Sequence, residues 1–541
     1  MTFPMIRRLL APLAVLCLGG AAGCVDLKEN PITGITSAYY ATPVGFDAAV
    51  NSMYYPMKTY WALEKGSTMT VFGTDEFQKG ADGGYKFFND YTSGLNGDVD
   101  FIKNTWRDFY QGVNAANTVI DAAKTVNVPD ATKALRVGEA RFMRALYYFN
   151  LARTYGDVPL FIEPTAGVLT ETNRDPVAKV YAQVIADLLA AEQALPDKAA
   201  QYGRADRPAA QHLLAEVYLT RAAPGDFALA AAKAKAVVDN PRFKLLNSYR
   251  ENFDFGNEVN SEVVWAVQYT NDPLTNGADS VGNKLHLYFG YPYDLEIGMT
   301  RDIANDRPFK RFRPTTWLLN LWDRTKDSRY EQMFKNVWFV NFPNDSRIPK
   351  DASGKPRLIA GDTSVWFPGR EVTAAERASH AYTIYAPSQY GDAIFPVLNK
   401  FLDPSRTATN QESGQRDFPM MRLSNTYLML AEALMRDGKP DQALPYVNAI
   451  RTRAAKPGQT AAMQVTTADL NLDFILDERA RELTGECTRW YDLTRTGKLV
   501  ERVKLYNPGG APTVQAFHNL RPIPNNEILL STGTMKQNPG Y

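Results

Sequence analysis

The side chains best suited to chemistry are scattered along this chain and form no catalytic pattern. No histidine has a second histidine or a cysteine at helical spacing, and the zinc spacing HExxH does not occur. The sequence also lacks the nucleophile elbow GxSxG and the phosphate-binding patterns GxxxxGK[ST] and GxGxxG. The histidines are His212, His286, His380 and His518. We therefore expect no catalytic residue, no bound metal and no cofactor.

The densest run of carboxylates is DERARE at 477–482, followed by Glu486. A glycoside hydrolase needs two carboxylates placed across a sugar bond, so this run is the natural place to look for one. However, Arg479 and Arg481 interleave with the acids, and Glu478 and Glu482 lie one turn apart on one helix face. Ion pairs within and between helices explain the run better than acid–base catalysis. A membrane-tethered glycoside hydrolase remains the alternative from a different class.

Helices must position these side chains, because apolar residues recur at helical spacing in pairs of neighbouring segments. The clearest helix begins at Asp175 and Pro176, which suit the N-cap and the first helical position. The predicted helices span 46–55, 104–125, 135–155, 177–189, 208–221, 227–239, 421–435, 440–453, 468–483 and 489–504. Such pairs predict tetratricopeptide-like helical hairpins. An irregular helical bundle is the alternative, since no strict 34-residue period is visible.

The predicted fold class is mainly α, with the hairpins in two blocks of one globule. The N-terminal block spans 45–240 and contains a loop-rich segment at 66–100, and the C-terminal block with the chain's tail spans 417–541. Between them, 241–416 is rich in Gly, Pro and Asn, with short strand-like runs such as 263–267. Loops held by a rigid frame often carry binding residues, so we expect 241–416 to bind the ligand.

The first residues of the chain have the pattern of a secretion signal, which predicts that the protein is exported. Arg7 and Arg8 precede an apolar run at 9–18, and small residues then lead to Cys24. We interpret 1–23 as a lipoprotein signal peptide, Cys24 as the acylated first residue of the mature protein, and 24–44 as a tether. Cys17 as the acylated residue and ordinary cleavage near Ala22 are the alternatives. No later stretch approaches about 20 consecutive apolar residues, so a lipid rather than a spanning helix would hold the protein at the membrane.

Composition limits the partners and the source of stability. The 60 basic and 59 acidic residues nearly cancel, which gives no electrostatic reason to expect a nucleic acid as partner. If Cys24 carries lipid, Cys487 is the only other cysteine of the mature chain, so no intramolecular disulfide can form. Stability must come from burial of a core.

Several segments resemble the RagB/SusD family of nutrient-uptake lipoproteins. The segments, in chain order, are WRDFY at 106–110, ARFMRA at 140–145, YGDVP at 155–159, the run at 478–493, LRPIPNNEI at 520–528 and QNPGY at 537–541. They span the mature chain. The tail departs from the family at 531–534, where STGT replaces the usual Asn-Pro turn.

The resemblance implies a fold and a task. Members are outer-membrane lipoproteins at the cell surface, built on tetratricopeptide-like helices and held through an N-terminal lipid. They act as a lid on a SusC-like TonB-dependent transporter, binding a nutrient without cleaving it. The cargo is most often an oligosaccharide, and peptides or another small nutrient are the alternative. The helical face is expected to contact the transporter.

Aromatic residues in the loops provide a physical basis for sugar binding, because flat rings pack on the C–H faces of sugars while amides and charged groups satisfy the hydroxyls. The predicted ligand-binding residues are Tyr60, Trp61, Tyr85, Phe87, Phe88, Asn89, Tyr288, Tyr291 and Tyr293. For any one of them, burial in the core is the alternative.

Overall fold

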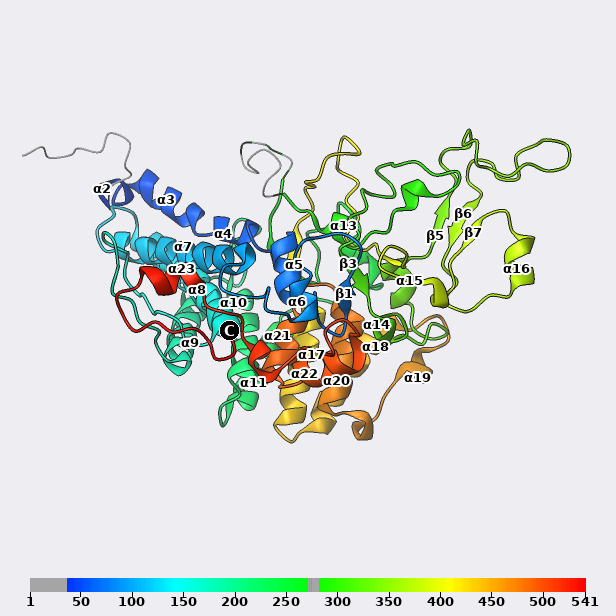
Figure 1. Cartoon of the computed structure of the whole chain (residues 1–541). Coiled ribbons are helices and arrows are strands. Elements are labelled where there is room, and N and C mark those ends of the chain that lie inside the picture. The colour runs from blue at the N-terminus through cyan, green and yellow to red at the C-terminus, as the bar shows by residue number, and fades with distance from the viewer. Residues whose placement is uncertain (1–36, 271, 273, 275–281) are drawn as a thin grey trace, which may run out of the picture.

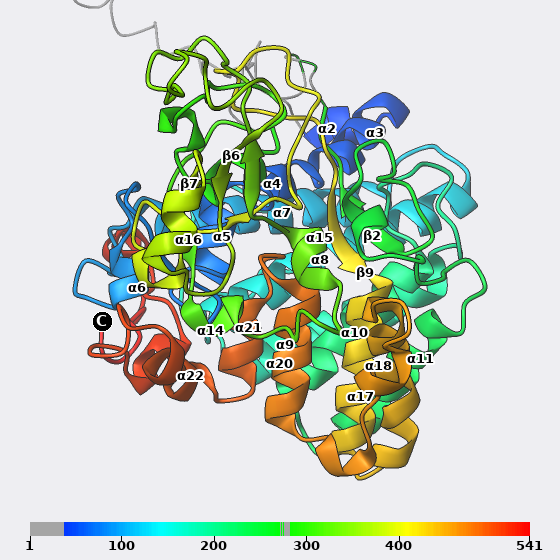
Figure 2. The same cartoon turned by 90° about the vertical axis from the view of Figure 1, so that its right-hand side faces the viewer.

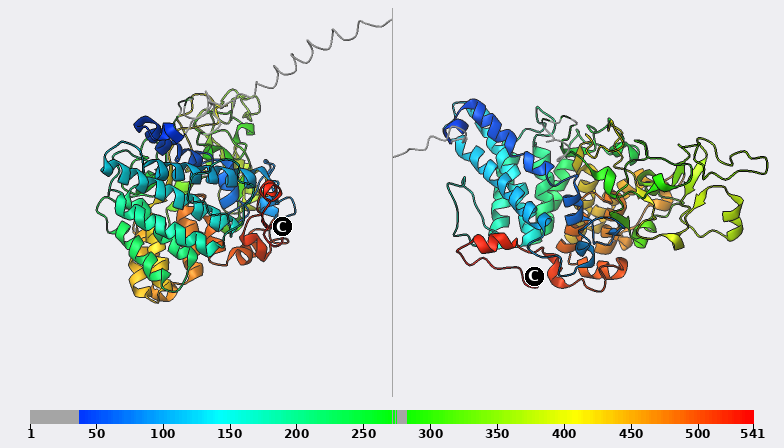
Figure 3. Two further views of the ribbon diagram at one scale, coloured as in Figure 1. Left: turned by 90° about the vertical axis from the view of Figure 1, so that its left-hand side faces the viewer. Right: turned by 45° about the horizontal axis from the view of Figure 1, so that its top comes forward.

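The computed structural model describes residues 37–270, 272, 274 and 282–541. The predicted signal peptide and Cys24 lie outside these residues. Helices occupy one end of the described chain and loops with short strands occupy the other (Figures 1 and 3). None of the described helices combines the length and the apolar character needed to cross a bilayer.

The N-terminal block begins with short helices and continues with long paired ones. Its elements are α2 (Ser37–Tyr40), α3 (Pro43–Ser52), α4 (Tyr55–Lys58), α5 (Glu64–Thr70), β1 (Phe77–Lys79), α6 (Phe87–Asp90), α7 (Asp100–Ala122), α8 (Asp130–Tyr155), α9 (Val177–Ala194), α10 (Arg207–Arg221) and α11 (Asp226–Val238). Local signals fix the ends: the Asp206 side chain caps α10 by accepting from the N–H of Ala209, and Ala222 ends that helix in the left-handed region.

The C-terminal block repeats the pattern. Its elements are α17 (Leu423–Arg436), α18 (Pro440–Ala454), α19 (Thr460–Met463), α20 (Leu472–Leu483), α21 (Arg489–Arg495), α22 (Leu499–Tyr506) and α23 (Asn525–Leu530). The single helix predicted at 489–504 is in fact two, because the chain turns at Gly497, whose φ is +70°. The helix predicted from 468 begins later, where the Asn471 side chain caps α20 by accepting from the N–H of Phe474.

The two blocks form one continuous helical layer. Helix α7 packs on α8, α8 on α9, and α10 on α11; α11 then packs on α17, and α17 on α18. Figure 2 shows α10, α11, α17 and α18 side by side. The prediction of a mainly helical fold with paired helices is confirmed.

The segment between the blocks is a loop-rich insert with short strands and helices. Its elements are β2 (Val263–Val267), α13 (Leu285–Tyr288), β3 (Phe312–Pro314), α14 (Thr316–Leu319), α15 (Arg329–Met333), β4 (Phe334–Lys335), β5 (Val337–Phe339), β6 (Thr363–Trp366), α16 (Ala374–Ser379), β7 (Thr383–Ile384), β8 (Val397–Leu398) and β9 (Phe418–Arg422). Strand β2 pairs antiparallel with β9, with Val263 opposite Arg422, so the two ends of the insert meet.

Part of the insert has a core of its own. We call residues 291–299 and 337–397, which include the sheet β5–β6–β7, the insert lobe. Its buried cluster consists of Tyr291, Tyr293, Met299, Trp338, Val365, Phe367 and Phe395 and is separate from the main core. The lobe lies at the end of the molecule away from α2 (Figure 1).

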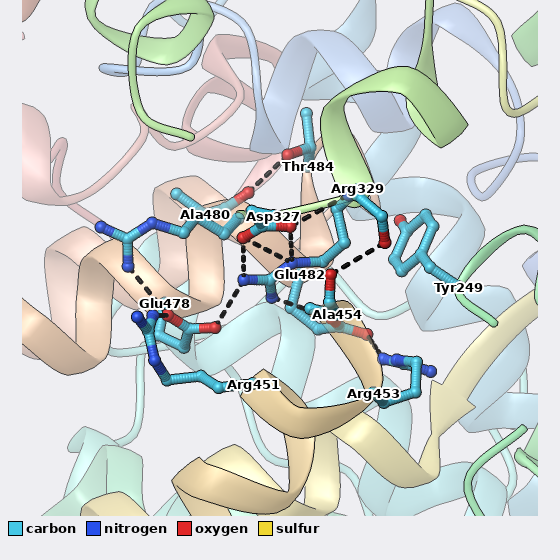
Figure 4. Close-up of polar contacts among 12 residues, drawn as sticks. Tyr249, Asp327, Arg329, Arg451, Arg453, Ala454, Glu478, Ala480, Glu482 and Thr484 are labelled. Atoms are coloured by element: carbon cyan, nitrogen blue, oxygen red, sulfur yellow. Dashed lines mark hydrogen bonds and ion pairs between the residues drawn. The ribbon is translucent and has the colours of Figure 1, made fainter. Parts of the chain in front are cut away.

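A buried ion-pair network joins the insert to the helical layer (Figure 4). Arg329, at the start of α15, lies 2.7 Å from Asp327, 2.9 Å from Glu478 and 3.1 Å from Glu482, and its side chain is 0% exposed. Arg451 of α18 also contacts Glu478, at 2.8 Å, and Arg453 of α18 pairs with Glu482. One insert residue is therefore held by carboxylates from α20.

The same network reaches the junction of the insert with both blocks. Arg422, at the end of β9, contacts Glu262 at 3.0 Å and Glu486 at 2.8 Å. Burial alone would raise the pKa of Glu482, but the guanidinium groups of Arg453, Arg422 and Arg329 hold it below its ordinary value. The carboxylate run at 477–482 thus forms ion pairs, as the sequence indicates.

Replacing Arg329 with methionine should strongly destabilise the protein. Arg329→Met keeps the side chain's length but leaves the buried Asp327 without its ion-pair partner and removes one of the cations around Glu478 and Glu482. Loss of one partner of a buried pair costs about 3–5 kcal/mol. Urea unfolding followed by circular dichroism measures this loss. Lys124→Met is the matched control, because Lys124 pairs with Asp121 at the exposed surface, and should leave the midpoint unchanged. Equal midpoints for both variants would show that the network does not stabilise the fold.

Candidate ligand-binding cleft

Most of the predicted ligand-binding residues lie in the core, which is the alternative that the sequence left open, and their contact with a ligand stays a prediction. Seven of them are at most 4% exposed: Tyr60, Trp61, Phe88, Asn89, Tyr288, Tyr291 and Tyr293. Most of these residues are aromatic, and an aromatic ring buries more apolar surface in a core than almost any other side chain. The sequence could not distinguish a ring that faces a ligand from a ring on the underside of the same loop.

Specific contacts hold these residues inside. The ring of Trp61 lies 4.9 Å from that of Tyr60 and 5.9 Å from that of Phe109, and Tyr291 packs edge-on against Trp338 at 4.9 Å. Asn89 accepts a hydrogen bond from the side chain of Asn507 at 2.9 Å. Tyr293 donates to the backbone carbonyl of Asp306 at 2.6 Å, and Tyr288 packs against Phe312.

Tyr85 and Phe87 are only half-buried. Tyr85 stacks on Phe101 with ring centroids 3.8 Å apart, so one of its faces is already covered. Phe87 packs edge-on against Tyr85 at 6.0 Å. Contact between these two rings and a ligand remains a proposal.

The basic residues of the insert are paired rather than gathered into an anion site. Arg301 lies 2.6 Å from Asp294, Arg307 lies 2.9 Å from Glu412, and Arg313 lies 3.4 Å from Asp392. Arg311 pairs with Glu64. These ion pairs neutralise the cluster.

The structure instead offers a cleft of about 690 Å³ between the first helices and the end of β2. We call it the candidate cleft. One wall comes from α3 and α4, the other from the turn at 201–204, and β2 with the residues after it forms the floor. Its lining includes Asn51, Tyr54, Tyr55, Lys58, Gln201, Tyr202, Arg204, Trp265, Gln268 and Tyr269. Cavities of this size accommodate a small-molecule ligand.

The rim of the candidate cleft carries exposed rings and amides. Tyr55 is 52% exposed and Tyr202 is 36% exposed, whereas Trp265 and Tyr269 on the floor are buried. The amides of Gln201 and Gln268 are also exposed. Rings can cover the apolar faces of a ligand while amides exchange hydrogen bonds with its hydroxyls. The chemistry suits a neutral polyhydroxylated molecule.

One buried carboxylate fixes the wall of the candidate cleft. The Glu139 side chain is 1% exposed; it accepts from the Tyr54 hydroxyl at 2.7 Å and from Arg204 at 3.0 Å. Arg204 in turn donates to the Asn51 side chain at 2.8 Å and to that of Gln201 at 2.6 Å. These charge-assisted bonds hold the turn against α3, so the wall is organised before any ligand binds.

A carboxyl group bonded to the floor, but outside the lining of the candidate cleft, has a shifted ionisation. The backbone N–H of Tyr269 donates to Asp417 at 2.9 Å, yet burial raises the pKa of Asp417 to about 6. The nearby charge of Glu258 adds to this rise, and Lys58 opposes it. Tyr202 donates to the backbone carbonyl of Glu258 at 3.1 Å, which helps to fix the rim.

Sequence reasoning missed Tyr55 and Tyr202 because both lie in or beside helical segments outside the loop-rich regions. A usable signal was present at Tyr202, which stands in a polar turn, Gln201-Tyr202-Gly203-Arg204, just before a helix. The neighbours of Tyr202 in the sequence are polar or small, so they offer little apolar surface against which its ring could be buried.

A second, smaller groove of about 430 Å³ lies beside α7. Its lining includes Trp106, Tyr110, Asn114, Phe161, Leu169 and Glu527. Tyr110 donates to the carbonyl of Pro159 at 2.7 Å, and Asn114 accepts from the N–H of Thr165 at 2.8 Å. These bonds hold the 159–175 loop against α7.

Comparison with known proteins identifies the family. The family model described as "SusD family" matches residues 261–541, just over half of the chain, and a model described as "Starch-binding associating with outer membrane" matches residues 36–219. The descriptions of these models are those of outer-membrane and starch-binding proteins, not of enzymes.

Individual proteins agree with this match. SusD-like protein P2 of Formosa agariphila is 28% identical, with 96% of this chain and 97% of that protein aligned. Starch-binding protein SusD of Bacteroides thetaiotaomicron is 27% identical, with 77% of this chain and 75% of that protein aligned. The solved structure of a laminarin-binding SusD-like protein superimposes with a TM-score of 0.69 at 26% identity, covering 92% of this chain and 100% of that one. With the matched family model, these likenesses show that the chain belongs to the SusD family.

Proposed function

We propose that this protein binds an oligosaccharide at the outer surface of the cell and delivers it, as a lid, to a SusC-like TonB-dependent transporter. It binds the sugar without cleaving it, and a lipid on Cys24 anchors it to the outer membrane. Membership of the SusD family supports the general task of nutrient binding. The relatives described as starch-binding and laminarin-binding support a glucan as the first class of ligand to test.

The observation that carries the sugar-binding proposal is the pair of exposed rings on the rim of the candidate cleft. Tyr55 and Tyr202 face solvent there, with the amides of Gln201 and Gln268 nearby. Neutral sugars need ring stacking and hydrogen bonding more than a charged pocket, and Arg301, Arg307, Arg311 and Arg313 of the insert are each paired with a carboxylate. We assign Tyr55 and Tyr202 to stacking and the two glutamines to the hydroxyl groups.

The proposed contact with the transporter is supported by a second surface. Five exposed apolar residues, which we call the tethered-end patch, come from the 159–175 loop and the end of α23: Ile162, Val168, Leu169, Leu529 and Leu530. Leu169 also lines the groove beside α7. Hydrogen bonds hold the two segments together, since the N–H of Thr532 donates to the carbonyl of Thr170 at 2.7 Å. The patch lies at the same end of the molecule as α2 (Figures 1 and 3). Exposed apolar patches mark interaction sites on soluble domains.

Removing either exposed ring of the candidate cleft should weaken sugar binding. Tyr55→Ala and Tyr202→Ala should each reduce affinity about 5- to 30-fold, because a lost stacking face costs about 1–2 kcal/mol. Isothermal titration with laminari- and malto-oligosaccharides measures the change, and chromatography of the same mixtures should show no shorter products. Phe339→Ala is the control, because Phe339 is 55% exposed but lies on β5, outside the candidate cleft.

Three results would contradict these assignments. Unchanged affinity in both tyrosine variants would exclude the candidate cleft as the sugar site. Binding of peptides with no binding of any oligosaccharide would favour the peptide cargo. Release of reducing sugar would indicate a hydrolase.

Charge placed on the tethered-end patch should separate the protein from its transporter. From detergent-solubilised outer membranes, the wild type should co-purify with a large β-barrel protein, whereas a Leu529→Asp, Leu530→Asp double variant should not, because the new carboxylates would be desolvated in the contact. Leu505→Asp, on α22 and 63% exposed, is the matched control and should retain the barrel. Cys24→Ala should move the protein from the membrane to the soluble fraction. Full retention of the barrel by the double variant would place the contact elsewhere.

A further inference from the structure

A small enclosed cavity lies where the main core meets the insert lobe. Its volume is about 10 Å³, and its lining includes His286, Asn305, Asp306, Lys335, Trp338 and Asn399. His286 belongs to α13, whose other residues fill the main core, while Trp338 belongs to the core of the lobe. The cavity thus borders both cores.

His286 is the unusual side chain of this cavity. It is 0% exposed, and among the described residues neither ring nitrogen has a hydrogen-bond partner. The nearest carboxylate oxygen, Oδ1 of Asp306, is 3.7 Å from Nε2, which is too far for a hydrogen bond. Leaving a buried polar group unpaired costs about 1–3 kcal/mol, and native proteins rarely accept this cost.

A second buried polar atom at this cavity also lacks a hydrogen-bond partner. Trp338 is 1% exposed, and its Nε1–H finds no acceptor among the residues that the structure describes. Lys335, also in the lining, places its ammonium group 5.4 Å from the Trp338 ring and pairs with the Asn305 side chain. Both cores therefore present an unpaired nitrogen at one small cavity.

The protonation state of His286 determines which ligand can form hydrogen bonds with both of its ring nitrogens. Burial and the charges of Arg406, Lys284 and Arg416 lower the pKa of His286 well below its ordinary value, so the ring is neutral. A neutral imidazole has one N–H donor and one acceptor nitrogen. Its partner must be able to both accept and donate.

Size and charge then exclude the other small ligands. A halide ion accepts hydrogen bonds but donates none, so the acceptor nitrogen of the imidazole would stay unpaired. A metal cation would leave the imidazole N–H and the Trp338 N–H unpaired and would meet the charge of Lys335. A cavity of about 10–15 Å³ holds one water molecule, which can both donate and accept.

We infer that this cavity is a binding site for one permanent water molecule, which pairs the imidazole of His286 at the junction of the main core and the insert lobe. The water supplies hydrogen bonds that neither core supplies alone, and so contributes to holding the lobe on the helical layer. This inference does not depend on the proposed function, because it concerns the fold of the chain alone.

A crystal structure of the full chain at about 1.5 Å resolution, grown with sodium bromide, tests the inference. The expected result is a fully occupied water peak within hydrogen-bond distance of a His286 ring nitrogen, without anomalous signal at the bromine edge. An anomalous peak would show a halide site and overturn the inference, and so would a cavity without density.

Two variants provide a solution test. His286→Gln keeps a donor and an acceptor and should retain the water, whereas His286→Leu removes both and should lose it. In thermal unfolding, the midpoint temperature of the leucine variant should lie about 1–3 °C below that of the glutamine variant. Equal midpoints, or a leucine variant above the glutamine variant, would count against a water held by the imidazole.

Discussion

The fold depends on the pairing of buried arginines with buried carboxylates between the insert and the helical layer. Charges inside a protein are tolerated only when each has a partner, so every member of the network constrains the position of the others. Arg329 comes from the insert, Arg422 from β9, and Glu478 and Glu482 from α20. An insert with few strands of its own is thereby tied to the scaffold at defined points. Hydrophobic contact alone would allow the insert to slide, whereas directional ion pairs do not.

The same principle shapes the candidate cleft. Glu139 holds Tyr54 and Arg204 in place, so the exposed rings of Tyr55 and Tyr202 are displayed on a fixed wall. A site organised in advance loses less conformational entropy when a ligand binds, which matters for sugars, whose contacts are individually weak. A neutral surface with a few flat rings also agrees with a chain whose charges nearly cancel.

The helices could be predicted from the sequence, because each buries one apolar stripe and the 3.6-residue period is a local property. Several boundaries differed by a few residues, and those at Asn471 and Gly497 depend on single capping or turning residues. The ligand residues could not be predicted in the same way. A tyrosine in a loop can face solvent, like Tyr202, or fill a core, like Tyr291, and only the packing of distant segments decides between them. The carboxylates of α20 were easier to interpret, because their arginine partners are partly in the same helix.

The pairing of β2 with β9 has a consequence for how this architecture diversifies. Because Val263 stands opposite Arg422, the chain leaves the scaffold and returns to it at nearly the same place. Loops between these two strands can therefore lengthen or shorten without displacing a helix of the scaffold, provided that Arg329 keeps its partners on α20. Such changes would reshape the surface beside Gln268 and Tyr269, while Tyr55 and Tyr202 stay on the helical scaffold.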